Sequence, residues 1–243
     1  IGLMANNLLP ARLGEFVRAY VLGRREEISR TASFATIVYE RIVDVFSLLV
    51  LLFLLLLRVP GPDWLGRSAM WLLGANVLLM VAMLAMERYR NVVIRLVVWV
   101  SRPLNERARA QIRKVTEGYI DGLGGMIQAR TLLPIALGSI AVWGFALVAV
   151  YLCFGALGIE VPYIASVAVV VLIAMGSMIP SAPAYLGTTQ YACVLSLGLF
   201  GVGKSEALAY SILFHALQFF PVTALGLYLL GKTQIRWRDI SSR

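Results

Sequence analysis

Three charged residues stand at helical spacing at the start of a long apolar run. Glu40, Arg41 and Asp44 come just before the segment from Val45 to Leu57, which is apolar apart from Ser47. In a helix these three side chains form one stripe, because residues three and four positions apart are neighbours. The arginine could bind an anionic headgroup. The carboxylates could hold a proton, since burial and proximity raise a carboxylate pKa. The alternative is a salt bridge at the membrane interface.

A second polar group surrounds the pair Pro10 and Gly14, which should interrupt a helix. Its members are Asn6, Asn7, Arg12, Glu15 and Arg18. In a helical conformation Arg12, Glu15 and Arg18 share one face. An arginine at membrane depth is a natural ligand for a phosphate group, so this segment is a candidate substrate site. The alternative is a cytoplasmic segment with solvated charges.

Neutral polar residues follow a second interruption, from Pro183 to Gly187. They are Thr188, Thr189, Gln190 and Tyr191, together with Tyr185 inside the interruption. His215 and Gln218 then share a helical face one turn before Pro221, which should kink its helix. Hydroxyl and amide groups suit a sugar, glycerol or water better than a bare phosphate. The threonines could instead cap a helix, and a lone histidine within a membrane is often only a packing hydrogen-bonder.

No other constellation indicates catalysis or a cofactor. The two cysteines, Cys153 and Cys193, lie in apolar segments, and His215 is the single histidine, so neither a disulfide framework nor a zinc site is expected. A Gly-rich phosphate loop before a helix is also lacking. We therefore expect no metal, no cofactor and no assigned catalytic residue.

The elements that carry these residues are too apolar for a soluble domain. Of the 243 residues 60% are hydrophobic and only 14% are charged, with a mean hydropathy of +0.81. About 20 apolar residues cross a bilayer as a helix, and these runs show no strand-like alternation. The apolar runs cover residues 38–57, 69–86, 132–154, 163–179 and 207–230. They predict an all-α, polytopic transmembrane helical bundle with Pro/Gly-broken helices.

The net charge of +9 comes from clusters between the apolar runs, which argues for membrane orientation and against nucleic acid. Lys and Arg concentrate in residues 12–30, 87–130 and 232–243. By the positive-inside rule these segments, including the C-terminus, are cytoplasmic. Residues 163–200 must then leave the external side and return to it, either as a re-entrant hairpin or as two short crossings.

The predicted organisation is a single transmembrane domain over residues 1–243, with residues 87–130 as a cytoplasmic connector. In the connector Val92, Leu96 and Val100 recur at helical spacing opposite Arg95, which predicts an amphipathic helix at the interface. Topology-setting charge is the alternative explanation. Because the chain begins at Ile1 without Met or a signal pattern, we expect it to be a fragment or a processed chain.

The two interruptions match one another in sequence. Pro10–Gly14 aligns with Pro183–Gly187, and downstream Arg41 aligns with His215 and Asp44 with Gln218. The span after the first unit should run outwards and the span after the second inwards. The matches therefore predict an inverted repeat, which in transporters places broken helices around a site at the membrane midplane.

These blocks resemble a known family. Residues 6–15 (NNLLPARLGE), Arg18-Ala19-Tyr20 and residues 39–44 (YERIVD) closely resemble the flippase-like family named for the lysylphosphatidylglycerol synthase transmembrane region. Pro183–Thr188, Phe200-Gly201-Val202 and residues 215–221 resemble its second block. Ala184 departs from the glycine that is common there. Members usually carry further spans before the first block, so about the first quarter is expected to be missing.

The resemblance implies a lipid-handling domain. In the multiple peptide resistance factor a similar domain precedes a soluble aminoacyltransferase, which this chain lacks, so a transporter-like protein is expected rather than an enzyme. Stand-alone relatives that accompany glycosyltransferases suggest polyprenyl-phosphate lipids. The leading hypothesis is a lipid translocase of the prokaryotic cytoplasmic membrane, acting on an anionic phospholipid or a polyprenyl phosphate. The alternative is a membrane subunit or scaffold of a lipid-modifying enzyme. A homo-oligomer is compatible with either.

Overall fold

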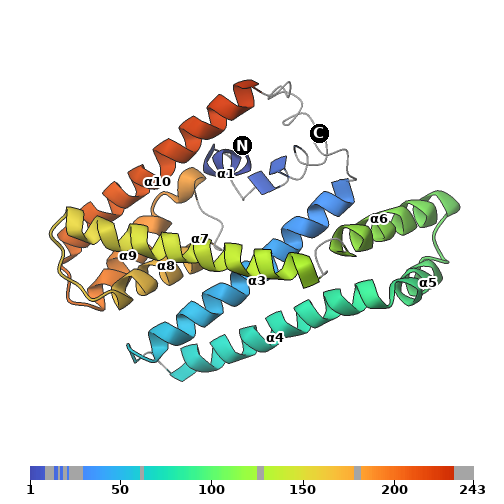
Figure 1. Cartoon of the computed structure of the whole chain (residues 1–243), viewed down its shortest axis with the longest axis horizontal. Coiled ribbons are helices and arrows are strands. Elements are labelled where there is room, and N and C mark those ends of the chain that lie inside the picture. Colours follow the sequence, from blue (N-terminus) through green and yellow to red (C-terminus); the bar gives the residue numbers. More distant parts are fainter. Residues whose placement is uncertain are drawn as a thin grey trace. The chain divides into compact units, whose positions relative to one another are not determined.

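A computed structural model of the chain describes residues 1–8, 14, 15, 17, 18, 21, 30–60, 63–124, 129–177 and 182–232. All regular structure in these ranges is helical, with no β-strand, so the all-α prediction is confirmed. The elements, shown in Figure 1, are α1 (Gly2–Leu8), α3 (Arg30–Leu56), α4 (Asp63–Arg88), α5 (Arg90–Val100), α6 (Glu106–Gly124), α7 (Ala129–Ala156), α8 (Ile164–Gly176), η1 (Pro183–Tyr185), α9 (Thr188–Gly198) and α10 (Lys204–Lys232).

Three of the described helices are long and apolar enough to cross a membrane. They are α4, α7 from Leu133 onwards, and α10. Their apolar side chains are largely exposed; on α7, Phe145 is 76% exposed and Ile140 69%. Such exposure in water would oppose folding at about 25 cal/mol per Å² of apolar surface, whereas lipid covers it at no such cost. The structure is that of a helical membrane protein.

Helix α3 is also long, at 27 residues, but it differs from these three because it carries Glu40, Arg41 and Asp44 near its middle. The predicted span 38–57 lies almost wholly within it, and the prediction that residues 45–57 continue one helix from the charged stripe is confirmed through Leu56. The charged residues occupy the part of the helix that precedes the uninterrupted apolar stretch.

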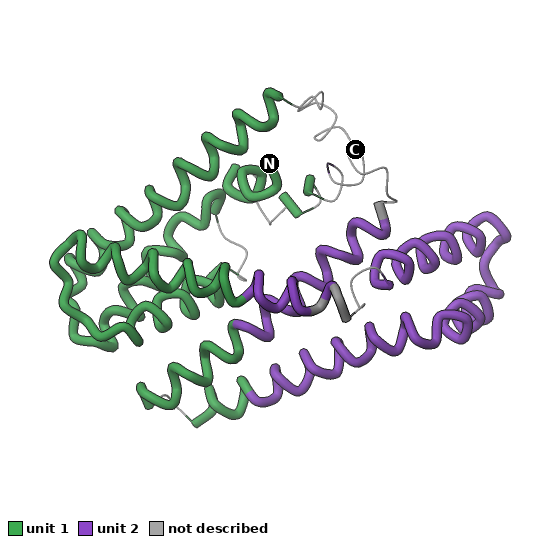
Figure 2. Tube along the Cα trace, in the orientation of Figure 1, with its two compact units in different colours: residues 1–18, 48–69, 140–243 green, residues 19–47, 70–139 purple. Residues whose placement is uncertain are grey.

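The chain divides into two compact units (Figure 2). Unit 1 comprises Ile1–Arg18, Leu48–Ala69 and Ile140–Arg243, and unit 2 comprises Ala19–Ser47 and Met70–Ser139. In unit 2 the core is formed where α3, α4 and α6 meet. Its buried members are Ala35, Tyr39, Ile42, Met83 and Leu123. Asn76 of α4 is buried there and donates its amide N–H to the carbonyl oxygen of Ile42 at 3.2 Å.

Unit 1 is organised around a pair of short helices, α8 and α9, which pack against one another, while α10 packs against α9. A turn with a glycine precedes α8, and another follows α9. After α7, Gly158 has φ +67 and the amide of Ile159 donates to the Phe154 carbonyl. After α9, Gly201 has φ +80 and the amide of Val202 donates to the Leu197 carbonyl. Glycine reaches this left-handed conformation without a Cβ clash, so each helix can stop abruptly.

The lengths of α8 and α9 bear on how residues 163–200 enter the membrane. With 13 and 11 residues, these helices extend about 20 and 16 Å at 1.5 Å per residue, well short of the roughly 30 Å hydrocarbon core. Figure 1 shows the start of α8 and the end of α9 on the same side of unit 1. These dimensions favour the re-entrant hairpin over two full crossings.

The basic connector forms two helices in unit 2, α5 and α6, that pack against each other. Helix α5 begins directly after α4, with Tyr89 between them at φ −108 and ψ 33. Residues 101–105 join α5 to α6, and the amide of Ala108 donates to Asn105 Oδ1 at 2.8 Å. The segment with the predicted amphipathic pattern, residues 92–100, is thus helical.

Candidate functional site

The second interruption is a break in the backbone between α8 and α9. Ala184 and Tyr185 have φ values of +59 and +57, and Gly187 has φ +87. Left-handed backbone costs a residue with a Cβ roughly 1–2 kcal/mol, whereas glycine adopts it freely. Consecutive left-handed residues cannot continue an α-helix, so the chain turns at this point and begins α9 anew.

The first turn of α9 is held by polar residues that the sequence had singled out. Gln190 Oε1 accepts a hydrogen bond from the Gly187 amide at 2.8 Å, and Thr188 Oγ1 donates to the Tyr185 carbonyl at 2.9 Å. Thr189 is buried. Thr188 thus stabilises the turn locally, in line with the capping alternative. Gln190 satisfies one backbone donor at the helix start and keeps its amide N–H₂ for another partner.

That partner is His215 of α10. Gln190 Nε2 lies 3.2 Å from His215 Nδ1. Because Gln190 Oε1 already accepts the Gly187 amide, its nitrogen is the atom that faces the imidazole, and an amide nitrogen can only donate. His215 Nδ1 must therefore accept, which makes the ring neutral with its proton on Nε2. The pair connects the break to α10 with a defined tautomer.

Helix α1, which precedes the first predicted interruption, lies beside the second interruption in unit 1, because it packs against both η1 and α10. Asn7 Nδ2 donates to Thr223 Oγ1 of α10 at 3.1 Å. Asn6 Oδ1 is buried and has no hydrogen-bond partner in the described part of the chain. Such a buried acceptor is costly unless something binds it, so it marks a polar point next to the break.

Gly14 and Arg18 lie against α1. A side chain at Gly14 would overlap Asn6, and one at Gly2 would lie 2.8 Å from the Cβ of Arg18. Glu15 is half-buried and Arg18 is exposed. Pro10 and Arg12 lie outside the described residues, so the first break itself and the inverted repeat stay predictions.

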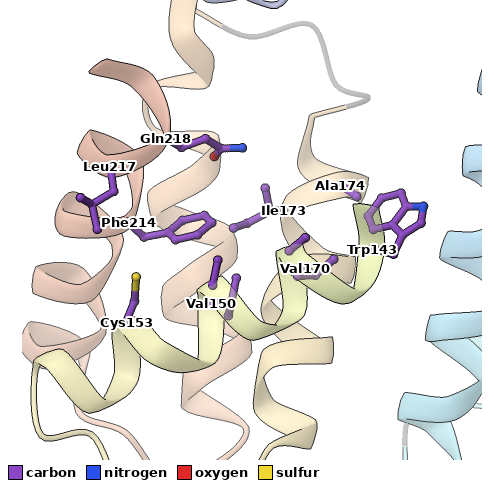
Figure 3. Close-up of a pocket in the computed structure, with 11 residues that line it drawn as sticks. Trp143, Val150, Cys153, Val170, Ile173, Ala174, Phe214, Leu217 and Gln218 are labelled. Carbon is purple, nitrogen blue, oxygen red and sulfur yellow. The ribbon is translucent and has the colours of Figure 1, made fainter. Parts of the chain in front are cut away.

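An apolar cavity of about 440 Å³ lies among α7, α8 and α10 in unit 1 (Figure 3). Val150 and Cys153 of α7, Val170 and Ile173 of α8, and Phe214 of α10 supply its apolar wall. Its polar groups are the amide of Gln218, three residues after His215 on the same helix, and the indole N–H of Trp143, which is buried and has no hydrogen-bond partner among the described residues. The cavity therefore adjoins the polar pair along α10 and has the chemistry to hold a hydrocarbon chain.

The stripe on α3 belongs to unit 2 and forms a cluster of its own. Arg41 Nη2 lies 3.1 Å from both Glu40 Oε1 and Asp44 Oδ2. The predicted arrangement of two carboxylates beside one arginine is thus present. The side chains are 41%, 37% and 28% exposed for Arg41, Glu40 and Asp44, so water or a ligand can reach them.

Sequence reasoning missed two features of the site. Thr223 was overlooked, although a lone hydroxyl in an otherwise apolar stretch was an available signal. The cavity lining is invisible in sequence, because Val150, Val170 and Phe214 look like any lipid-facing residue until the helices are assembled. No group of three or more potential metal ligands occurs within the described residues.

Comparison with known proteins places the chain in a family. Residues 1–226 match the family described as Lysylphosphatidylglycerol synthase TM region. A UPF0104 membrane protein of Methanothermobacter thermautotrophicus is 25% identical over 240 residues, covering 93% of this chain and 71% of the relative. Another from Methanocaldococcus jannaschii is 24% identical over 224 residues, covering 91% of this chain and 90% of the relative. No solved structure matches the chain. The resemblance seen in the sequence is confirmed, and the chain belongs to the Lysylphosphatidylglycerol synthase TM region family.

Proposed function

We propose that this protein is a lipid translocase of the cytoplasmic membrane that moves a phospholipid or a polyprenyl-phosphate lipid between leaflets. Membership in the family makes a lipid-related membrane activity the starting expectation. The chain crosses the membrane several times, with the Arg-rich residues 87–130 and the C-terminus on the cytoplasmic side, as the positive-inside rule requires.

The observation that carries the proposal is the neighbourhood of a polar break and an apolar cavity in unit 1. The Gln190–His215 pair lies at the start of α9, and Gln218, one turn along α10 from His215, lines the cavity among α7, α8 and α10. A lipid has the same division into a polar head and an apolar chain. In this arrangement the headgroup binds near the break while a hydrocarbon chain enters the cavity.

The charged residues would provide the phosphate ligands. In unit 1, Arg12 and Arg18 would bind a phosphate, and Glu15 would orient them or carry a coupling proton. In unit 2, Arg41 would be a phosphate ligand of its own cluster, with Glu40 and Asp44 in the corresponding role. Asn6, Asn7, Tyr185, Thr188 and Thr189 would supply further hydrogen bonds to the headgroup. Asn6 is favoured among them because its Oδ1 is buried and lacks a partner among the described residues.

The direct test is leaflet exchange of fluorescent phospholipids and polyprenyl phosphates in vesicles that contain the full-length protein. We expect headgroup-selective exchange that is lost in His215→Phe and Arg41→Ala. The Phe variant keeps an aromatic ring but removes its acceptor nitrogen, so Gln190 loses its partner. Val142→Ala, at an exposed position on α7, is the matched control and should exchange lipid at the native rate.

Three results would contradict parts of this proposal: the first concerns the role of Arg41, and the other two concern translocation itself. Exchange at the native rate in a folded Arg41→Ala protein would remove the arginine from the site. Headgroup chemistry altered by the purified protein without a change of leaflet would favour a membrane-embedded enzyme, with Glu40 or Asp44 as the acid or base. Absence of exchange combined with co-purification of a glycosyltransferase would favour a scaffold.

A further inference from the structure

A groove with four arginines runs along the α5–α6 hairpin of unit 2. It has a volume of about 830 Å³, and its lining includes Arg90, Arg95, Arg102, Arg113, Trp99 and Glu117. We name it the arginine groove. The residues come from both helices, so the groove depends on the packing of α5 against α6.

The hairpin that builds the groove is fixed at several points. Arg90 Nη1 forms an ion pair with Asp121 Oδ1 that joins α5 to α6. Arg109 Nη2 donates to the Arg102 carbonyl at 2.9 Å, which holds the turn between the helices. At the far end Leu123 is fully buried in the core of unit 2. The arginines are thus presented by a folded scaffold.

The groove has an excess of positive charge. Residues 90–124 contain seven Arg and Lys residues against three acidic ones. Arg90 is paired with Asp121, and Arg113 Nε binds Glu117 Oε1 at 2.8 Å. Arg95 and Arg102 form no ion pair with any described residue. Two guanidinium groups in one groove are therefore available to an anion, and phosphate oxygens match their planar donor geometry.

An exposed apolar stripe borders the groove on α5. Val92, Leu96 and Trp99 are 60%, 56% and 60% exposed, and none of the residues of α5 is buried. These three share a helical face, and Trp99 belongs both to this stripe and to the groove lining. In a membrane protein such a stripe lies at the boundary between headgroups and acyl chains, where tryptophan is enriched.

The position of the α5–α6 hairpin in the chain also supports a location at the boundary between headgroups and acyl chains. Helix α4 is long and apolar enough to cross the membrane and ends at Arg88, and α5 starts two residues later. Tyr89 lies between them outside helical regularity, and in Figure 1 α5 turns away from the line of α4. A helix that starts directly after a membrane-spanning helix is expected at the membrane surface, where its arginines would reach the level of lipid phosphates.

We propose that the arginine groove is a binding site for the phosphate headgroup of an anionic membrane lipid, with the Val92–Leu96–Trp99 stripe of α5 inserted beside it. Binding here requires only that α4 ends at the membrane surface. It does not depend on lipid translocation or on the break between α8 and α9. A nucleic acid or an acidic protein would use the charge but leave the apolar stripe without a partner.

The test measures binding of short-chain phosphatidylglycerol to the full-length protein in a neutral detergent, with phosphatidylcholine and inorganic phosphate as comparison ligands. The test variant is Arg95→Gln/Arg102→Gln. The matched control is Arg107→Gln/Lys114→Gln, which removes the same charge from exposed positions of α6 outside the groove lining. We expect phosphatidylglycerol affinity to fall about 30-fold in the test variant and less than about threefold in the control.

Other outcomes would overturn the assignment. An equal loss in both variants would mean diffuse charge attraction and no site. If inorganic phosphate binds as tightly as phosphatidylglycerol, the lipid is not the ligand. The same conclusion would follow if the test variant kept its affinity for the lipid but lost binding of a short RNA or an acidic peptide. A second variant, Arg95→Lys/Arg102→Lys, keeps the charge and guards against misfolding. Its affinity for phosphatidylglycerol should lie between that of the native protein and that of the Gln variant.

Discussion

The amide of Asn7 donates to the hydroxyl of Thr223 at 3.1 Å, joining residues that are 216 positions apart in the chain. Asn7 is on α1, just before the first predicted interruption, and Thr223 is on α10, just after Pro221. The bond therefore attaches one polar block to the last helix, on which His215, about two turns earlier, pairs with Gln190 of α9. Thr223 is itself buried, so its hydroxyl depends on partners within the protein.

A double-mutant cycle between these two residues should reveal coupling. We expect Asn7→Ala and Thr223→Val each to lower thermal stability in detergent, with an interaction free energy of about 0.5–1.5 kcal/mol, the range for hydrogen bonds between membrane helices. Unfolding of the two single variants and the double variant measures it. Strictly additive effects would show that the bond does not contribute.

The contact between α1 and α10 should tolerate no side chain at Gly226. A Cβ there would overlap the side chain of Met4, which is fully buried and cannot move aside. Gly226→Ala should lower the free energy of unfolding by about 1–3 kcal/mol, the usual effect of overpacking. Gly231→Ala, in the same helix with nothing within 4 Å, is the control. This control substitution should be neutral or stabilising, because alanine has a higher helix propensity than glycine. Equal thermal stability of the two variants would contradict the packing.

Substitution at the break should have opposite effects at neighbouring positions. Ala184 has φ +59, so Ala184→Gly should stabilise the protein by about 1 kcal/mol through relief of left-handed strain. Ala182 has φ −55 and ψ 156, which alanine adopts readily. Ala182→Gly should therefore destabilise by about 0.4–1 kcal/mol through gain of unfolded-state entropy. Unfolding curves of both variants give the signs, and a destabilising Ala184→Gly would be inconsistent with this backbone.

A re-entrant hairpin at residues 163–200 would determine where single cysteines can be labelled. In a background with Cys153→Ala and Cys193→Ala, we expect Glu160→Cys to react with a membrane-impermeant maleimide from outside and Lys114→Cys from the cytoplasm. Thr188→Cys, at the start of α9, should react slowly from both sides, because α8 spans only about 20 Å of a roughly 30 Å core. Rapid cytoplasmic labelling of Thr188→Cys would indicate two full crossings.

Filling the apolar cavity should impair lipid exchange without unfolding the protein. Ala146→Phe places a ring in the space among α7, α8 and α10, and it should slow leaflet exchange by about tenfold or more, corresponding to about 1.4 kcal/mol. Ala141→Phe adds the same ring at an exposed position of α7 outside the cavity lining and should exchange at the native rate. Native exchange in a folded Ala146→Phe protein would exclude the cavity as the path of the hydrocarbon chain.

Much of the architecture was predictable because it depends on local properties. Transfer of a helix into lipid is a sum over its own residues, so the apolar runs at 69–86, 132–154 and 207–230 located α4, α7 and α10 without knowledge of any partner. The interruption at Pro183–Gly187 was also readable, since proline and glycine act on the backbone where they stand. The ion pairs of Arg41 with Glu40 and Asp44 were predictable because all three residues lie on one helix.

By itself, then, the sequence determined the helical class, the membrane as solvent, the family, the break before α9 and the charged stripe on α3. Tertiary structure decided that Gln190 binds His215, that Asn7 binds Thr223, and that three unremarkable apolar faces enclose a cavity of about 440 Å³. The reason is physical. A hydrogen bond between helices and a cavity among them depend on the rotation and spacing of packed helices, and in a uniformly apolar helix no periodicity in the sequence specifies which side will face a neighbour.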